Sequence, residues 1–388
     1  MPAARSLYAP LLRALVLRTP ALCALVLLAE LFAAGPLAPR KLVAQELAAR
    51  DFLDQSAAVD SLVQPNQPTL PPEPYISPLG TAYFTVDTMG FSRSNPAGNF
   101  AATSPGRVAL SGDDLDFAFV PGLRALLGVR LSDYTSIEAS YFGLFDWNEQ
   151  NSVRNNQLNA LASAGNLFSP FSGFGQAPQA GLDFNYLVDV RVESQFNSGE
   201  VNLRRRLDMP YSTVQCAAIF GTRYLTIRDR FFYRSESLEP NPAGTVNTAE
   251  VGTNNRMLGP QIGGALEMHV AQRAWLNFET KGAMLFNQAS QGTVFQTGPL
   301  AGGGTPVYGT RSDQRLAFAA DLQVTLMWKF SQAIVGRLGY QAIFVEGLAL
   351  GSENFNRNAL NAPTDPSQLV KDGNAAIHGP FTGLTITW

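Results

Sequence analysis

The residues of this sequence that could do chemistry are charged side chains placed singly among apolar ones. In the stretch 315–330 every even position is apolar, whereas Arg315, Asp321 and Lys329 occupy odd positions. A period of two puts successive side chains on opposite faces of a strand. The charges that share the polar parity in this and similar stretches are Arg124, Arg130, Glu138, Asp189, Arg191, Glu193, Glu267, Glu279, Lys281, Asp321, Lys329 and Arg337. Their mixed signs predict an internal network in which pairing offsets the cost of desolvation.

Nothing in the sequence indicates a catalytic or metal site. A hydrolase would need a histidine paired with Ser or Asp at one rim, but the chain has only His269 and His378. His269 falls beside a predicted short turn, and His378 is expected in the interior or at a rim, near the start of the last strand. Two distant histidines do not form a metal site, and Cys216 has no second thiol beyond Cys23. We therefore predict no enzyme activity, no metal and no cofactor.

Ten long segments with this alternation follow one another between residues 80 and 388. They exceed the roughly 5–6 residues of an ordinary strand. Phe145 and Trp147 are expected on the same face as Ile137, and the alternation slips near Gly199 and Gly221, which predicts a bulge at each. The expected strands are 81–92, 118–131, 135–147, 184–207, 213–234, 255–269, 274–287, 315–330, 334–344 and 375–388.

The connections between these strands alternate in length. Short turns follow the even-numbered strands, and long polar loops follow the odd-numbered ones. This alternation is typical of a transmembrane β-barrel with short periplasmic turns and long outer loops. We predict an all-β, up-and-down antiparallel transmembrane barrel of about ten strands, with twelve as the alternative count. The residues expected to face lipid include Leu316, Phe318, Leu322, Val324, Leu326 and Trp328.

Two other classes of protein fit the sequence less well. A secreted soluble β-sandwich also has one apolar face per strand, but its strands are shorter and its loops do not alternate in length. A helical membrane protein would need an apolar run of about 18 residues or more, which is not found after the N-terminal region. The net charge of −3 gives no case for nucleic-acid binding.

The N-terminal region predicts export from the cytoplasm. Arginines precede an apolar run from 21 to 34, as in a secretory signal peptide. We assign residues 1–45 to the signal peptide, with cleavage between 34 and 45, residues 46–79 to a disordered Pro-rich linker, and residues 80–388 to the barrel. The cell outer membrane of a Gram-negative bacterium is the expected location.

The segment 80–388 also resembles a known family. Glu200-Val-Asn-Leu-Arg-Arg, Gly221-Thr-Arg-Tyr-Leu, Gly259-Pro-Gln-Ile-Gly-Gly and the final Thr-Trp, in this order, are similar to outer-membrane β-barrel proteins that planctomycete bacteria encode in many copies. The resemblance implies an exported barrel and brings no substrate with it. A terminal aromatic residue is similar to the signal read by the barrel assembly machinery, which would give Trp388 a role in insertion.

The predicted function follows from the charges inside a narrow barrel. Ten strands leave little more room than eight, whose interior side chains can fill. We expect a mostly closed barrel that serves as envelope structure or binds through its outer loops. A narrow porin-like channel for small solutes is the alternative. The expected partners are outer-membrane lipid, which Arg204, Arg205 and Arg206 reach by snorkelling, and the assembly machinery. The sequence leaves a homo-oligomer open.

Overall fold

The computed structural model of the chain describes residues 82–103, 107–154, 165–179, 181–207, 214–237, 244–299, 304–362 and 364–388. All of them belong to the second of the two units into which the chain divides, Ser77–Trp388. The predicted signal peptide and linker lie outside the described residues, as does the predicted turn at 208–211. Within the described ranges no helix is both long enough and apolar enough to cross a membrane.

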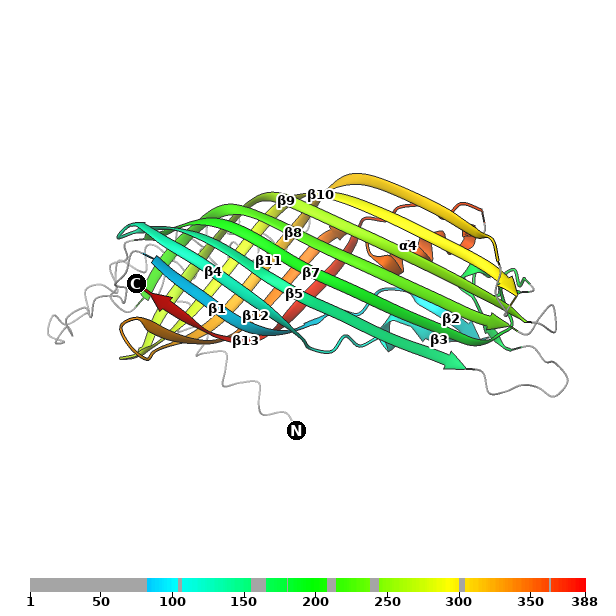
Figure 1. Cartoon of the computed structure of the whole chain (residues 1–388), viewed down its shortest axis with the longest axis horizontal. Coiled ribbons are helices and arrows are strands. Elements are labelled where there is room, and N and C mark those ends of the chain that lie inside the picture. Colours follow the sequence, from blue (N-terminus) through cyan, green and yellow to red (C-terminus); the bar gives the residue numbers. More distant parts are fainter. Residues whose placement is uncertain are drawn as a thin grey trace, which may run out of the picture. The chain divides into compact units, whose positions relative to one another are not determined.

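Ten antiparallel strands form a closed ring (Figure 1). In ring order they are β1 (Ala82–Arg93), β4 (Val120–Ser132), β5 (Thr135–Arg154), β7 (Asn185–Leu207), β8 (Val214–Ser237), β9 (Thr245–Ala271), β10 (Ala274–Pro299), β11 (Pro306–Lys329), β12 (Ile334–Leu348) and β13 (Gly373–Thr387). β13 pairs with β1, and the Trp388 amide donates to the Ala82 carbonyl over 3.1 Å. The ring confirms the barrel and its ten strands, and it rules out the β-sandwich.

Several strands are longer than the sequence predicts. The segments 235–254 and 288–313, expected as loops, are largely strand, because β8 runs to Ser237, β9 begins at Thr245, β10 reaches Pro299 and β11 begins at Pro306. Their Gly, Thr, Asn and Ser residues suggest a loop by composition. The ladder continues there nonetheless, since inward residues such as Val251 and Phe295 are buried and hold the alternation.

A bulge interrupts the wall on β5, and the other register shifts of the wall lie near strand ends. The register between β5 and β7 shifts between Phe142 and Phe145, and Leu144 has a φ of 67°. The extra residue moves Phe145 and Trp147 to the interior, where both are buried, so their expected outward position was wrong. The bulges expected at Gly199 and Gly221 were also wrong, because β7 and β8 keep one register past both glycines.

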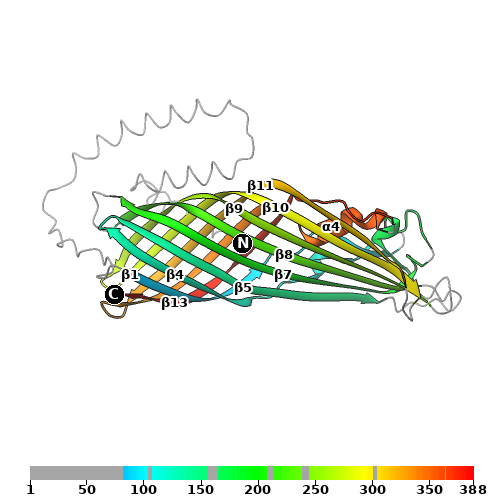
Figure 2. The same cartoon turned by 45° about the horizontal axis from the view of Figure 1, so that its top comes forward.

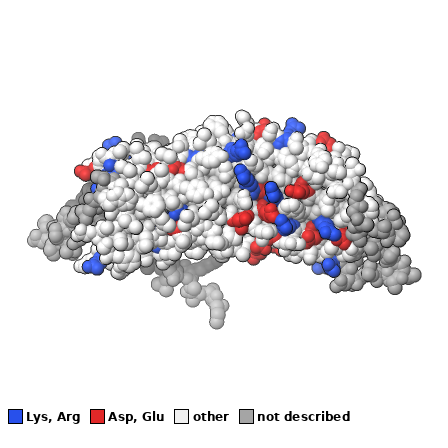
Figure 3. All heavy atoms as spheres, in the orientation of Figure 1, with Lys and Arg blue, Asp and Glu red and all other residues white. Residues whose placement is uncertain are grey.

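Apart from β5 with its bulge, each long strand has the same alternate residues pointing inward throughout. Halfway along, however, the apolar side chains change from the outward to the inward positions. On β7 near the short turns, Val201 points outward and Glu200 inward; farther along, Arg191 points outward and Val190 is buried inside. The half near the turns therefore has an apolar exterior and a polar interior, as a membrane requires. The other half is built like a soluble protein. Figure 3 shows charged side chains gathered over that half, while the surface nearer the turns is mostly uncharged.

Connecting segments fill the far half of the barrel. They comprise the short strands β2 (Asn99–Thr103), β3 (Arg107–Ser111) and β6 (Leu167–Phe168), the 3-10 turns η2 (Gly112–Asp114), η3 (Pro170–Ser172) and η4 (Ala359–Asn361), and the helix α4 (Gly351–Asn358). Figure 2 shows α4 at the end away from the C-terminus. Phe355 of α4 stacks on Tyr233 with ring centroids 5.0 Å apart and lies 4.7 Å from Phe231. The plug, as we call these segments, thus shares one apolar core with the strands.

Candidate functional site

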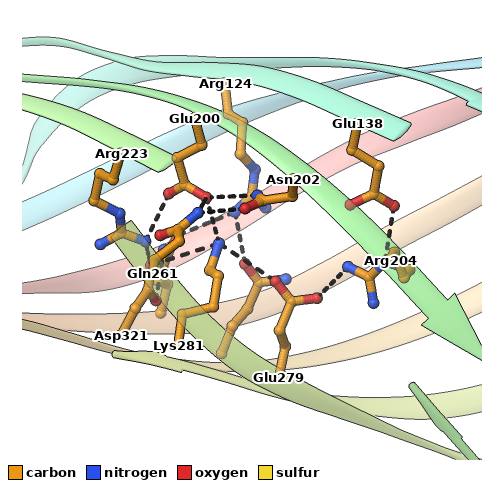
Figure 4. Close-up of polar contacts among 12 residues, drawn as sticks. Arg124, Glu138, Glu200, Asn202, Arg204, Arg223, Gln261, Glu279, Lys281 and Asp321 are labelled. Atoms are coloured by element: carbon orange, nitrogen blue, oxygen red, sulfur yellow. Dashed lines mark hydrogen bonds and ion pairs between the residues drawn. The ribbon is translucent and has the colours of Figure 1, made fainter. Parts of the chain in front are cut away.

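The membrane half of the barrel holds a network of charged and amide side chains that point into the interior (Figure 4). They come from nine of the ten wall strands, since each residue takes the inward position of its own strand. We call the following set the lumen network: Tyr83, Asp87, Arg124, Glu138, Glu200, Asn202, Arg204, Arg223, Gln261, Glu279, Lys281, Asp321, Gln323, Arg337 and Gln341.

One part of the network is centred on Arg124. Its Nη2 lies 2.5 Å from Oδ2 of Asp87, and its Nη1 donates to Oε1 of Gln323 over 2.6 Å. Asp87 also meets Arg337, whose Nε lies 3.2 Å from Oδ1. Gln341 accepts from Arg124 over 3.0 Å and donates to Asp321 over 2.9 Å. The glutamine therefore connects a cation on one side of the interior with a carboxylate on the other.

The centre of the network is a square of alternating charges. Nη2 of Arg223 lies 2.6 Å from Glu200 and 3.1 Å from Asp321. Nζ of Lys281 lies 2.9 Å from Glu200 and 3.9 Å from Asp321. Gln261 donates a further hydrogen bond to Glu200 over 3.0 Å. Each carboxylate thus faces two cations, which is the arrangement that buried ions need.

Arg204 carries the network toward the short turns. Its Nε donates to Glu138 over 2.8 Å, and its Nη2 donates to Glu279 over 2.6 Å. Glu138 also accepts from the hydroxyl of Tyr83, and Glu279 lies 3.4 Å from Lys281. The expected snorkelling of Arg204 to lipid headgroups was wrong, because its strand position is inward and two carboxylates hold it there.

The network is electrically balanced. Its five bases and five acids cancel: Arg124, Arg204, Arg223, Lys281 and Arg337 against Asp87, Glu138, Glu200, Glu279 and Asp321. Arg223, Glu200 and Asp321 are buried. Since unpaired ions in such a place would each cost several kcal/mol, balance is the condition under which this interior can form.

The charges predicted from the sequence fall into three groups. Arg124, Glu138, Glu279, Lys281, Asp321 and Arg337 all lie in the lumen network. Arg130, Glu267 and Lys329 share the inward parity but sit nearer the short turns. Asp189, Arg191 and Glu193 do not face the interior; they point outward on the far half of β7, opposite the buried face of Val188, Val190 and Val192. Their predicted place was wrong because the apolar face there is the inner one.

Four charges of the network were missed: Asp87, Glu200, Arg204 and Arg223. The parity signal was present at each. Asp87 is the single charge of the predicted strand 81–92. Glu200 and Arg204 alternate with the outward Val201 and Leu203. The outward Phe220 and Tyr224 likewise place Arg223 inside on β8.

Both histidines lie outside the lumen network. His378 is on the outward face of β13, where its Nδ1 is 2.7 Å from the hydroxyl of Tyr340; the expected interior or rim position was wrong, because its parity matches that of Leu384 and Ile386. His269 is exposed beside the short turn after β9. Among the described residues there is no group of three or more His, Cys, Asp or Glu side chains that could hold a metal ion.

A second polar contact lies deeper in the plug half. Arg93 and Asp229 form a two-pronged ion pair with distances of 2.7 and 2.9 Å, and Ser194 donates to the same carboxylate over 2.7 Å. Glu353 on α4 lies near this pair. The pKa of Glu353 is raised to about 7, first by burial and then by Asp372 and Asp229, while Arg93 opposes the shift. The carboxyl therefore titrates close to neutral pH.

Asparagine side chains hold the plug to itself and to the wall. Asn255 of β9 donates to the Ala349 carbonyl and accepts from the Ala349 amide, both over 2.8 Å. Asn354 does the same with Val370, over 2.9 and 2.7 Å. Asn358 does so with Gln368. Each side-chain amide forms the pair of hydrogen bonds that a neighbouring strand would form with the backbone. These pairs hold the segment after β12 in place.

The sequence matches one family model over residues 92–388, that of the family described as "Putative beta barrel porin-7 (BBP7)". The chain belongs to this family. It is thus an outer-membrane β-barrel protein, as the closed ring and the apolar belt require, and its location is the cell outer membrane. The predicted likeness to outer-membrane barrels is confirmed. A search of curated proteins found no match.

Several solved structures share the barrel in outline. The outer membrane protease OmpT from Escherichia coli is 11% identical, with 80% of this chain and 98% of that chain covered and a TM-score of 0.44. The P. putida toluene transporter TodX is 9% identical, with 80% and 91% covered and a TM-score of 0.33. Acinetobacter baumannii CarO is 10% identical, with 78% and 98% covered and a TM-score of 0.22.

Proposed function

We propose that this protein is a closed barrel that anchors a folded outer platform in the outer membrane, and that the platform, not the lumen, makes the functional contacts. The platform is the far half of the barrel with its plug. The observation that carries the proposal is the balanced lumen network, in which buried cations and carboxylates from opposite walls bond to one another.

The network supports closure by its geometry. Arg223 joins β7 to β11, and Arg124 joins β1 to Gln323 and Gln341 of β11 and β12. A solute moving along the axis would have to separate these contacts. Each separation exposes a buried charge without its partner, at a cost of about 3–5 kcal/mol when a buried pair is broken.

The packed aromatic side chains are a second observation that supports a closed barrel. Above the network Phe91 stacks on Phe145 at 5.0 Å, and Phe145 stacks on Trp147 at 5.5 Å. The Trp147 indole donates to the Phe91 carbonyl over 3.0 Å. Farther along, Phe171 packs against Phe295 of β10. Close-packed rings of this kind support a core that excludes water.

Planar-bilayer recording tests the proposal. The purified full chain, shown to be folded by its mobility shift on boiling, should insert without giving steady unitary currents. Steady currents from the wild-type protein that scale with salt concentration would overturn the closed barrel.

A narrow channel for small solutes is the second candidate, and the family description as a porin favours it. In that case the wild-type protein should conduct, and swelling of protein-loaded liposomes should depend on solute size. We propose no enzyme activity, since both histidines lie outside the lumen network and one of them is engaged by Tyr340 on the outer face.

A further inference from the structure

Three arginines lie side by side on the outward face of the β8–β9 pair. Arg228 and Arg230 are on β8 and Arg256 is on β9, and all three are exposed. Most other charges of the barrel have a partner, including Arg191 with Glu193 and Arg234 with Glu236. Within the described part of the chain, these three guanidinium groups make no hydrogen bond or ion pair. They are three neighbouring cations whose donors are available.

Their depth is that of lipid headgroups. The belt of outward apolar residues that begins at the short turns ends on these strands at Tyr224 and Leu258, which are register partners. Phe232 and Val246 lie outward again beyond the arginines. Arg256 takes the next outward position after Leu258, about 7 Å farther along the strand. Long basic side chains at this level reach the polar layer of the leaflet while their stems lie against the apolar belt.

Where the apolar belt ends, the outward residues of β8 and β9 are arginines, and those of other strands are not. At a similar level the outward residue on β5 is Asp146 and that on β12 is Glu346. Figure 3 shows blue side chains, with red ones among them, along the boundary between the uncharged half and the charge-bearing half. General anchoring at the interface would not require cations on one strand pair and carboxylates elsewhere, so the grouping points to a specific contact.

Arg228 and Arg256 have neutral hydrogen-bonding groups as register neighbours. Arg228 stands between Gln195 of β7 and Asn254 of β9, and Gln288 of β10 stands beside Arg256. The Asn254 side-chain oxygen has no hydrogen-bond partner in the described structure. Carboxylates lie beside Arg230. Glu193 is opposite it on β7 and is engaged by Arg191. Glu250 takes the outward position of β9 next to Gly252, the register partner of Arg230. The amides can donate to an oxygen-rich ligand without competing for the cations.

A shallow hollow adjoins the arginines. Gly252 lies opposite Arg230, and Gly292 lies opposite Gly252, so two outward positions in a row carry no side chain. A Cβ atom added at either glycine would meet no atom closer than 3.9 Å. A bulky headgroup therefore has room against the backbone at this point.

We propose that this surface binds the phosphate group of an anionic lipid in the outer leaflet. We call it the β8–β9 patch: Arg228, Arg230 and Arg256 with Gln195, Asn254 and Gln288. The planar guanidinium presents paired donors that match phosphate oxygens. Outward neighbours on adjacent strands are about 5–8 Å apart, so one phosphate can be shared or two can be held. The acyl chains lie along Tyr224, Leu258 and Phe286. The inference goes beyond the closed barrel and holds for an open one too.

The test compares lipid retention between matched variants of the full chain. The patch variant is Arg228→Gln/Arg256→Gln. The control, Arg107→Gln/Arg273→Gln, removes two exposed arginines on β3 and on a short turn. Each folded protein is reconstituted in phosphatidylcholine vesicles with or without phosphatidic acid, re-extracted, and its bound lipid counted by native mass spectrometry. A parallel sample replaces phosphatidic acid with a fatty acid, which is anionic without phosphate.

We expect the wild type and the control to retain phosphatidic acid over both other lipids, and the patch variant to bind it roughly tenfold more weakly. A loss of that size corresponds to one charge-assisted contact or more. Equal retention by the wild type and the patch variant would overturn the proposal, as would equal retention of fatty acid. If inorganic phosphate alone raises the unfolding temperature as much as the lipid does, the site takes free phosphate and the lipid assignment fails.

A second variant keeps the test decisive should the glutamine protein not assemble. Arg228→Lys/Arg256→Lys preserves both charges but removes the paired donors. Weaker retention than the wild type, with a steeper loss as salt is added, supports recognition by guanidinium. Unchanged retention in this variant shows that only the net charge matters and overturns a specific site.

Discussion

Arg223 on β8 donates a hydrogen bond to Asp321 on β11 across the interior of the barrel, with 3.1 Å between Nη2 and Oδ2. In the ring β9 and β10 separate these two strands, so the bond crosses the lumen instead of following the wall. Both side chains are buried, and the same nitrogen lies 2.6 Å from Glu200. The contact ties three strands together in the layer that faces the membrane.

Neutralising the acids at this crossing should open the lumen. In Glu200→Gln/Glu279→Gln/Asp321→Asn, five bases face the two remaining acids, which leaves a net charge of +3. Repulsion and water entry should separate the cations, and the surplus charge should favour anions. We expect unitary currents in planar bilayers with anion selectivity, where the wild type gives none.

The control for that variant removes three exposed acids on the outward face: Asp146→Asn/Glu250→Gln/Glu346→Gln. It should assemble and stay as silent as the wild type. A lumen variant that shows the mobility shift of a folded barrel but carries no current would mean that the aromatic core alone closes the barrel.

The docking of α4 should depend on pH through Glu353. The pKa of this carboxyl is raised to about 7 by burial, then by Asp372 and Asp229, from an ordinary value of 4.5. The folded protein holds the proton more tightly than the unfolded chain, so the docked state is favoured at low pH. Its stability should fall as pH rises from about 4.5 to about 7 and then level off.

Hydrogen exchange of the α4 segment at pH 5.5 and 8 measures this effect once it is corrected for the intrinsic rate. Protection should be lower at pH 8 in the wild type and equal at both values in Glu353→Gln. Glu250→Gln, which changes an exposed acid on β9, should keep the wild-type difference. Identical protection of wild-type α4 at both pH values would contradict the assignment.

The sequence predicted the membrane half well, because the alternation there indicates both that the segment is a strand and which of its faces is apolar. On β11 the even positions Leu316 to Trp328 are outward, and Asp321 is inward, as the alternation indicates. The short turns gave the ring its order. Periodicity alone fixed which residues share a face, and the membrane fixed which face is apolar.

The far half could not be predicted in the same way, since its solvent is water on the outside. There the apolar parity points inward, so Asp189 and Val190 exchange the roles that the membrane half assigns. The bulge at Leu144 also leaves no clear trace, because Ile137 and Trp147 share a parity that looks continuous in sequence. Pairing partners such as Arg223 and Asp321 depend on closure of the ring, which no local pattern encodes.

The side chain of Trp388 should be needed for assembly, separately from its backbone. The backbone closes the ring through two hydrogen bonds with Ala82, of 3.1 and 3.2 Å, while the indole is exposed on the outer face. Trp388→Lys keeps the backbone and should lower the amount of folded barrel in the membrane severalfold if the terminal aromatic ring is the recognition signal. Trp388→Phe should restore it.

The amount of barrel that shifts on boiling, in isolated outer membranes, measures the outcome. Tyr134→Lys is the control, because it places a cation on an exposed aromatic position near the same end without touching the terminus. Should Trp388→Lys and Tyr134→Lys reduce the barrel equally, the indole contributes interface packing and no signal.

The outward face of β11 carries the last prediction. Leu322 is 59% exposed and its neighbour Asp321 is 1% exposed, so the wall separates them. If Leu322 meets hydrocarbon, Leu322→Arg should cost about 2–4 kcal/mol of barrel stability. Gln314→Arg, on the same face of β11 but beyond the apolar belt, should be close to neutral. Asp321→Arg should also be damaging, because it places a cation between Arg223 and Lys281.

Cysteine labelling separates the membrane from a merely buried face. In a Cys216→Ser background, Gln314→Cys should react with a charged, impermeant maleimide, whereas Leu322→Cys should react only with a reagent that partitions into the bilayer. Transfer to detergent-free vesicles keeps the comparison in lipid. Ready labelling of Leu322→Cys by the charged reagent in the folded protein would show that water reaches this face. The assignment of the outward apolar face of the membrane half to lipid would then be wrong.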